Sequence, residues 1–283
     1  MTVELNRGTS AGRASGPLPA AVVNLRHLMP RDGAHGVSRP TCPAVDKICY
    51  SLRDMKSNAW LPFLASLLIW LAGPVLAAET NSPFAHWEKD IAAFERADAT
   101  NPPPPGAVEF IGSSTIARWR TLVQDFPGQP VFNRGFGGSQ IADSTHFAAR
   151  VILPYAPRMI VLRAGGNDLW AGKTPEQVFA DFKQFTAVVH ARLPQAEIVF
   201  LSLSPSPARW KQHEQEKELN RRVQEFIRES PHLKYLEAYD LPLDAQGLPR
   251  PELFVADQLH FNAQGYQLLA DRVRPLFSED HLK

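Results

Sequence analysis

The chain has 283 residues, of which 44% are hydrophobic, and its formal net charge at pH 7 is +1. This length allows one large domain or two small ones, and the near-neutral charge gives no argument for a nucleic-acid partner. Both cysteines, Cys42 and Cys49, lie near the N-terminus, so the rest of the chain has neither a disulfide nor thiol chemistry.

Residues 1–54 are rich in Gly, Pro, Arg and Ser and show no sustained hydrophobic periodicity. The next segment, 55–78, has the layout of a secretory signal peptide: Lys56, then an apolar run, then a Gly73-Pro74 break and a small-residue end. The apolar run is shorter than the roughly 20 residues that span a membrane. An uncleaved membrane anchor is the alternative interpretation.

Signal peptides stand at the N-terminus of a nascent chain. We therefore expect translation to begin at Met55 and residues 1–54 to be a non-native or disordered extension. The mature protein is then expected to be periplasmic or secreted, with no stable membrane insertion after cleavage. Its residues from 79 onward carry slightly more acidic than basic side chains.

Residues 79–105 are predicted to form an N-terminal helix followed by a Pro-rich linker. Phe84, Trp87, Ile91 and Phe94 recur at helical spacing, which places them on one face. The run "NPPPPG" then ends the helix.

Residues 106–283 are predicted to form one domain in which apolar strands alternate with helical patterns. The expected strands are 108–112, 131–133, 159–163, 197–203 and 235–238, and the expected helices are 141–154, 175–193, 208–229 and 263–277. "TPEQ" at Thr174 predicts a capping box with proline at the first helical position. The charge-rich stretch "RWKQHEQEKELNRR" is predicted to be a solvated helix face, whereas Glu109, inside an apolar strand, has no explanation from the sequence.

Strands that alternate with helices indicate a three-layer α/β/α sandwich around a five-stranded parallel sheet. Sites in such sheets form beyond the carboxyl ends of the strands. The first strand is followed there by Ser113 and Ser114, the second by "NRGFGGSQ" and the third by "AGGNDLW". Ahead of the last helix stands "DQLHFN", in which Asp257 comes three residues before His260.

Alone, each of these features has an ordinary structural explanation: a serine caps a helix, a glycine forms a turn, an asparagine bonds its own loop. Together they supply the parts of a nucleophilic site. The Ser114 hydroxyl needs a base within hydrogen-bond reach, and His260 can be that base because histidine titrates near neutral pH. Asp257 can hold the second ring nitrogen, and the Ser114 amide, the Gly138 amide and the Asn167 side chain can stabilise an oxyanion.

These four blocks resemble those of the GDSL-type esterases of the SGNH hydrolase superfamily, over about residues 108–276. The resemblance implies a flavodoxin-like sandwich and serine-dependent ester hydrolysis. It assigns the catalytic residues Ser114, Asp257 and His260 and the oxyanion-hole donors Ser114, Gly138 and Asn167. The sequence departs from the family pattern at Ser113, where the family has Asp between the glycine, here Gly112, and the nucleophile.

We therefore expect an exported serine esterase that hydrolyses short-chain, chiefly acetyl, esters of a small molecule or a polysaccharide through an acyl-enzyme on Ser114. The alternatives are an acyltransferase acting on sugar hydroxyls and an inactive relative that binds polysaccharide. Phe136, Trp170 and Trp210 are candidates for stacking on substrate, with core packing as the alternative. No metal or cofactor is expected, because the histidines lack ligand spacing and "GFGGS" lacks the lysine of a P-loop.

Overall fold

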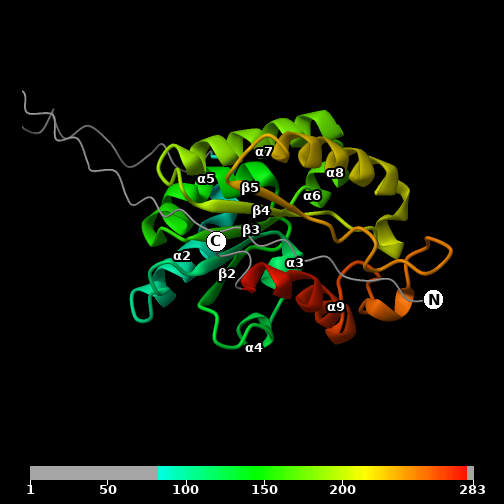
Figure 1. Ribbon diagram of the computed structural model, residues 1–283, viewed down its shortest axis with the longest axis horizontal. Coiled ribbons are helices and arrows are strands. Elements are labelled where there is room, and N and C mark those ends of the chain that lie inside the picture. The colour runs from blue at the N-terminus through cyan, green and yellow to red at the C-terminus, as the bar shows by residue number, and fades with distance from the viewer. Residues whose placement is uncertain (1–81, 279–283) are drawn as a thin grey trace, which may run out of the picture. The chain divides into compact units, whose positions relative to one another are not determined.

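The computed structural model describes residues 82–278 (Figure 1). Their centre is a five-stranded, wholly parallel sheet with the strand order β2-β1-β3-β4-β5. The strands are β1 (Val108–Gly112), β2 (Val131–Gly135), β3 (Met159–Arg163), β4 (Glu197–Leu201) and β5 (Leu233–Leu236). This is the flavodoxin-like order, whose direction switches between β1 and β3. The expected fold class is therefore confirmed.

Helices connect the strands and cover both faces of the sheet (Figure 1). The α-helices are α2 (Glu88–Asp98), α3 (Ser114–Ala117), α4 (Leu122–Asp125), α5 (Ile141–Val151), α6 (Gly166–Trp170), α7 (Pro175–His190), α8 (His213–Ile227) and α9 (Ala263–Val273). The 3-10 helices are η1 (Ala85–Trp87), η2 (Leu153–Tyr155), η3 (Pro207–Gln212), η4 (Pro251–Leu253) and η5 (Arg274–Phe277). None of the helices in residues 82–278 has the length and apolar character that crossing a membrane requires.

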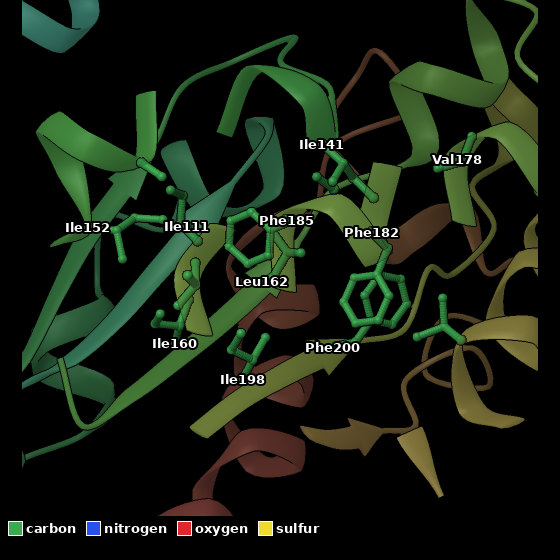
Figure 2. Packing of buried hydrophobic residues seen from close by; sticks show 14 of the residues in the cluster. Ile111, Ile141, Ile152, Ile160, Leu162, Val178, Phe182, Phe185, Ile198 and Phe200 are labelled. Carbon is green, nitrogen blue, oxygen red and sulfur yellow. The ribbon is translucent and has the colours of Figure 1, made fainter. Parts of the chain in front are cut away.

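Two apolar cores lie on opposite faces of the sheet, because successive strand residues point to opposite sides. On one face, Ile111 and Ile160 pack with buried residues of α5, α7 and α8, as Figure 2 shows in part. On the other face, Phe110 and Val161 pack against α3, α4 and α9. Strands buried on both faces are typical of a parallel sheet and explain the continuous apolar runs in the sequence.

Helix α2 packs on the sandwich through the apolar face that the sequence predicts. Ile91 is fully buried, and the other three residues of that face pack against the same core. At the end of α2, Asp98 accepts two hydrogen bonds from Arg134 of β2, at 2.8 and 2.6 Å. The residues before the Pro-rich segment are thus part of the folded unit. The predicted extension 1–54 and signal peptide 55–78 lie outside the described residues.

The largest differences from the predicted elements concern β5 and the helix after β4. Strand β5 lies two residues earlier than expected, because Ile198 pairs with Leu233 and Leu201 with Leu236. The predicted helix 208–229 is instead η3 followed by α8, with non-helical backbone angles at Arg209. The capping box at the start of α7 is present as predicted.

Gly112 closes β1 against β3 and cannot carry a side chain. Its φ is +139°, and a Cβ there would lie 2.1 Å from the Arg163 carbonyl oxygen. We expect Gly112→Ala to lower the free energy of unfolding by about 3 kcal/mol or more, because backbone of the neighbouring strand must move. Urea unfolding measures this change. Gly128→Ala is the control, because Gly128 also has a positive φ of +79° but open space around its Cβ position; equal losses would contradict the steric explanation.

Glu109 in β1 is fully buried, and neither carboxyl oxygen has a hydrogen-bond partner in the described structure. Burial raises the pKa of this carboxyl well above its ordinary value. The unfolded chain releases the proton at the ordinary glutamate pKa, so the wild-type protein loses stability as pH rises above that value. We expect Glu109→Gln to remove this loss, so that its stability relative to wild type increases between pH 5 and pH 8.

Urea unfolding of both proteins across this pH range tests the prediction. Glu252→Gln is the matched control, because the Glu252 side chain is exposed and its replacement should leave the pH dependence of stability as in the wild type. Parallel stability curves for wild type and Glu109→Gln would show that Glu109 does not carry the proton in the folded state.

Candidate active site

The corner between β1 and α3 places the Ser114 side chain at the carboxyl edge of the sheet. Ser113 is extended, with φ −87° and ψ −155°, and α3 begins at Ser114. The Ser113 amide donates to the Arg163 carbonyl at 3.1 Å, and the Phe136 amide donates to the Gly112 carbonyl at 3.0 Å. The two neighbouring strands therefore fix the bend. In the described part of the chain, the Ser114 amide donates to no acceptor.

Ser114, His260 and Asp257 form one hydrogen-bonded chain. His260 Nε2 lies 2.9 Å from Ser114 Oγ, and His260 Nδ1 lies 2.7 Å from Asp257 Oδ2. Because a carboxylate only accepts, Nδ1 carries the proton and Nε2 is free to accept the serine proton. The three residues that the sequence predicts to act together are thus brought together.

The Asp257–His260 turn positions its own two functional groups. Asp257 Oδ1 accepts from the backbone amides of Leu259 at 2.9 Å and His260 at 3.0 Å. Gln258 adopts a left-handed φ of 55°, and its carbonyl accepts from the Ala208 amide at 2.9 Å. The hydrogen bond from the His260 ring, together with the two backbone bonds, holds the pKa of the Asp257 carboxyl well below its usual range. Asp257 is therefore ionised throughout the pH range in which enzymes are assayed.

Two glycines and α6 flank the serine on its other side. A Cβ at Gly137 would lie 4.0 Å from Ser114 Cβ, so this turn passes close to the nucleophile. Gly138 has a positive φ of +92°, and its amide donates to no described residue. Asn167 donates from Nδ2 to the Ser139 carbonyl at 3.0 Å, which ties α6 to the glycine turn.

The side chain of Asn167 is held at both ends. Its Oδ1 accepts from Arg209 Nη1 at 2.9 Å, so the amide nitrogen is the end that points toward the glycine turn. The next residue, Asp168, is fully buried and pairs with Lys173 at 3.0 Å, which anchors α6. Burial raises the pKa of the Asp168 carboxyl in spite of this pairing. Asn167 therefore belongs to a short anchored helix rather than to the loop that the sequence predicts, because five residues are too few to show a helical period.

A small cavity of about 70 Å³ adjoins the serine. Ser114, Asn167 and His260 are among its lining residues, and Arg163 and Glu216 contribute to its polar lining. Within residues 82–278, no three His, Cys, Asp or Glu side chains gather as potential metal ligands. The arrangement can supply a nucleophile, a base with its carboxylate, and N–H groups that could stabilise an oxyanion.

Residues 107–268 match the family model of the GDSL-like Lipase/Acylhydrolase family. The chain belongs to this family. The GDSL-like chain is 31% identical to platelet-activating factor acetylhydrolase IB subunit alpha1 of Bos taurus over 175 residues, which are 56% of this chain and 69% of that protein. The protein is thus a hydrolase of ester bonds, as the sequence predicts.

Solved structures of a GDSL-like lipase and of an acetylxylan esterase share the fold. A GDSL-like lipase of Bacteroides thetaiotaomicron has a TM-score of 0.57 at 18% identity, with 66% of this chain and 96% of that chain covered. A catalytic mutant of an acetylxylan esterase from Geobacillus stearothermophilus has a TM-score of 0.52 at 15% identity, with 62% and 96% covered. At these identities the likeness concerns the fold alone.

The three aromatic candidates of the GDSL-like chain have different environments. Phe136 is 1% exposed and packs edge-on against Trp87, with ring centroids 5.2 Å apart, so its ring belongs to the core and is not available to substrate. Trp210 stacks on His213 at 4.0 Å, outside the cavity lining. Trp170 is 61% exposed, and the Arg209 guanidinium lies 5.0 Å from its ring centroid. Of the three, only Trp170 presents an open ring next to the site.

Arg163 and Arg209 are the site residues that sequence reasoning missed. Arg163 ends the apolar run of β3, and a charge at the carboxyl end of a buried strand could have identified it. Arg209 begins the charge-rich stretch "RWKQHEQEKELNRR", which the sequence predicts to be a solvated helix face. This prediction is wrong for part of the stretch. Gln212, Glu216 and Asn220 of that stretch are buried, and their spacing of four residues could have indicated an inward face.

Proposed function

We propose that this GDSL-like hydrolase cleaves short-chain, chiefly acetyl, esters of small molecules or polysaccharides through an acyl-enzyme on Ser114. The observation that carries the proposal is the unbroken chain from Ser114 Oγ through the His260 ring to the Asp257 carboxylate. An intact chain of this kind also argues against an inactive polysaccharide-binding relative.

In the proposed reaction, Ser114 Oγ bonds to the ester carbonyl carbon while its proton moves to His260 Nε2. The carbonyl oxygen takes the negative charge and faces the amides of Ser114 and Gly138 and the Asn167 side chain. One such donor typically contributes about 3 kcal/mol to the transition state. The C–O bond of the alcohol then breaks, and His260 returns the proton to the departing alcohol oxygen.

Water repeats the sequence on the acyl-enzyme. His260 removes a proton from the water, the hydroxide oxygen bonds to the acyl carbon, and the bond to Ser114 Oγ breaks. His260 gives the proton back to Ser114, and the carboxylic acid leaves. Asp257 stays ionised and stabilises the imidazolium in both halves of the reaction.

The preference for short acyl groups is supported by the size and lining of the cavity. About 70 Å³ next to Ser114 leaves little room for a long chain, and much of the lining is polar. A long acyl chain gains about 0.8 kcal/mol per CH₂ only where that group is buried. We expect p-nitrophenyl acetate and butyrate to exceed the dodecanoate in kcat/KM. Efficiency that climbs steadily to twelve or more carbons would contradict this preference.

Labelling by an organophosphonate ester tests the activity independently of substrate choice. We expect one label per chain, at the peptide that contains Ser114, and loss of hydrolysis in proportion to labelling. A chain that stays unlabelled and inactive would overturn the proposal. Export by the segment from Met55 to residue 78 stays a prediction, since that segment lies outside the described residues.

A further inference from the structure

Two guanidinium groups line the cavity beside Ser114, from Arg163 and Arg209. Arg163 is 5% exposed, and Arg209 is half-buried. Among residues 82–278, neither has a carboxylate within salt-bridge distance, unlike most of the other buried or half-buried arginines. Burying a charge without a counter-charge is costly, so this pair requires an explanation.

The hydrogen bonds of Arg163 go to neutral groups. Its Nη1 donates to the Ser202 carbonyl and its Nη2 to Ser204 Oγ at 2.7 Å. These bonds use fewer N–H groups than a guanidinium carries. Burial lowers the pKa of Arg163 to about 10, so the side chain is still charged at neutral pH.

Among the described residues, the hydrogen-bond partners of Arg209 are likewise neutral. Its Nη1 donates to Asn167 Oδ1 at 2.9 Å and to the Gly166 carbonyl at 3.4 Å, and its Cζ lies 5.0 Å from the centroid of the Trp170 ring. The Arg209 side chain lines the cavity, so the N–H groups of its guanidinium that make neither of these bonds can serve a ligand there. Arg209 thus binds the proposed oxyanion donor Asn167 and also lines the cavity.

Among residues 82–278, Glu216 supplies the one carboxyl that lines the cavity, and this carboxyl does not balance the charge of two guanidinium groups. Glu216 Oε1 accepts from Gln212 Nε2 at 2.7 Å. Even when ionised, Glu216 offsets a single guanidinium and leaves the cavity positive. Asp257 is engaged by His260 at 2.7 Å and also faces Arg118 at 3.8 Å.

We propose that this cavity is a subsite for a carboxylate group of the substrate, held by Arg163 and Arg209 while the ester carbonyl lies at Ser114. A planar carboxylate matches the fork geometry of a guanidinium and supplies the second counter-charge, which Glu216 alone does not provide. The inference rests on the proposed esterase function and narrows it to esters that carry a carboxylate near the scissile bond.

The carboxylate can belong to the acyl group or to the alcohol, and two matched substrate pairs distinguish these sources. Monoethyl succinate and ethyl 4-methylpentanoate have acyl groups of similar shape, one charged and one neutral. A mono-O-acetylated methyl glucuronide and the corresponding methyl glucoside differ only in the carboxylate on the sugar. Acid release in a pH-stat gives kcat/KM for each.

We expect the charged member of one pair to be preferred about tenfold or more, because charge-assisted hydrogen bonds to a carboxylate are the strong ones. Arg209→Gln and Arg163→Gln should each lower that preference about tenfold. The preference is a ratio within one variant, so any effect of Arg209 on Asn167 acts on both members and cancels. Arg163→Lys, which keeps the charge, should retain part of the preference and covers the case that Arg163→Gln does not fold.

Arg120→Gln is the matched control, because Arg120 is exposed, lies outside this cavity and gives the same change in net charge. If the wild-type enzyme cleaves the neutral and the charged members of both pairs with equal kcat/KM, the proposed subsite is refuted. The esterase function is not affected by that result. A preference that survives in both Arg209→Gln and Arg163→Lys at the wild-type value overturns it as well. An enzyme that cleaves none of the four esters and does not cleave p-nitrophenyl acetate either would overturn the esterase function itself.

Discussion

Ser114→Ala is expected to lower kcat for p-nitrophenyl acetate by about five to six orders of magnitude, the loss typical of removing a serine nucleophile. The hydroxyl of Ser114 is the one that lies 2.9 Å from His260 Nε2. Without it no acyl-enzyme forms, and labelling by the organophosphonate should disappear together with hydrolysis. The remaining rate reflects only water attack assisted by the oxyanion donors.

Ser113→Ala is the matched control one residue away. Ser113 also lines the cavity, but its side chain makes no cap hydrogen bond to α3, and no bond to the His260 ring is present. We expect this variant to keep most of the activity and to label normally. A variant pair with the opposite behaviour would move the nucleophile to Ser113 and refute the register of the Gly-x-Ser motif.

Asp257→Asn is expected to lower kcat by about four orders of magnitude with little change in KM. The amide introduced by this substitution would turn an N–H toward His260 Nδ1 if its oxygen kept the two backbone hydrogen bonds. Nδ1 would then have to accept, the ring proton would sit on Nε2, and the base could no longer take the proton of Ser114.

A matched control separates this explanation from a loss of folding. In the wild type, the low pKa of the Asp257 carboxyl keeps it ionised across the assay range, so protonation of Asp257 does not limit kcat/KM there. Asp271→Asn, which changes an exposed carboxylate that pairs with Arg274 at 2.5 Å, is the control and should match the wild type. An Asp257→Asn enzyme within tenfold of wild type would show that His260 needs no carboxylate partner.

The sequence predicts that Ser114, Asp257 and His260 lie together, because each of them follows a local signal. Ser114 stands where an apolar strand ends in glycine, and Asp257 and His260 are close in sequence, so their geometry is local. Parallel strands all end at one edge of the sheet, which brings these distant segments together whatever their side chains. The fold class follows from the same alternation of strands and helices.

What the sequence does not reveal is the direction in which an individual side chain points after a loop. Phe136 follows β2 near the site, yet its ring turns into the core against Trp87. Arg209 stands in a charge-rich stretch, yet its own non-helical backbone, inside η3, directs it to Asn167. Both outcomes depend on tertiary contacts between segments far apart in the chain, and hydrophobic periodicity carries no information about them.

The Asp257–His260 turn has a mechanical consequence. One tight turn carries both His260 and Asp257, the proposed base and its proposed carboxylate partner, so a displacement of this turn shifts both groups together. Two backbone contacts attach this turn to the rest of the domain. They are the antiparallel β-bridge between Phe254 and Phe261 and the hydrogen bond from the Ala208 amide to the Gln258 carbonyl. The proposed proton transfer then depends on one distance, the 2.9 Å between His260 Nε2 and Ser114 Oγ. We expect that a displacement of the turn that lengthens this distance would stop the proposed reaction without disturbing the sheet.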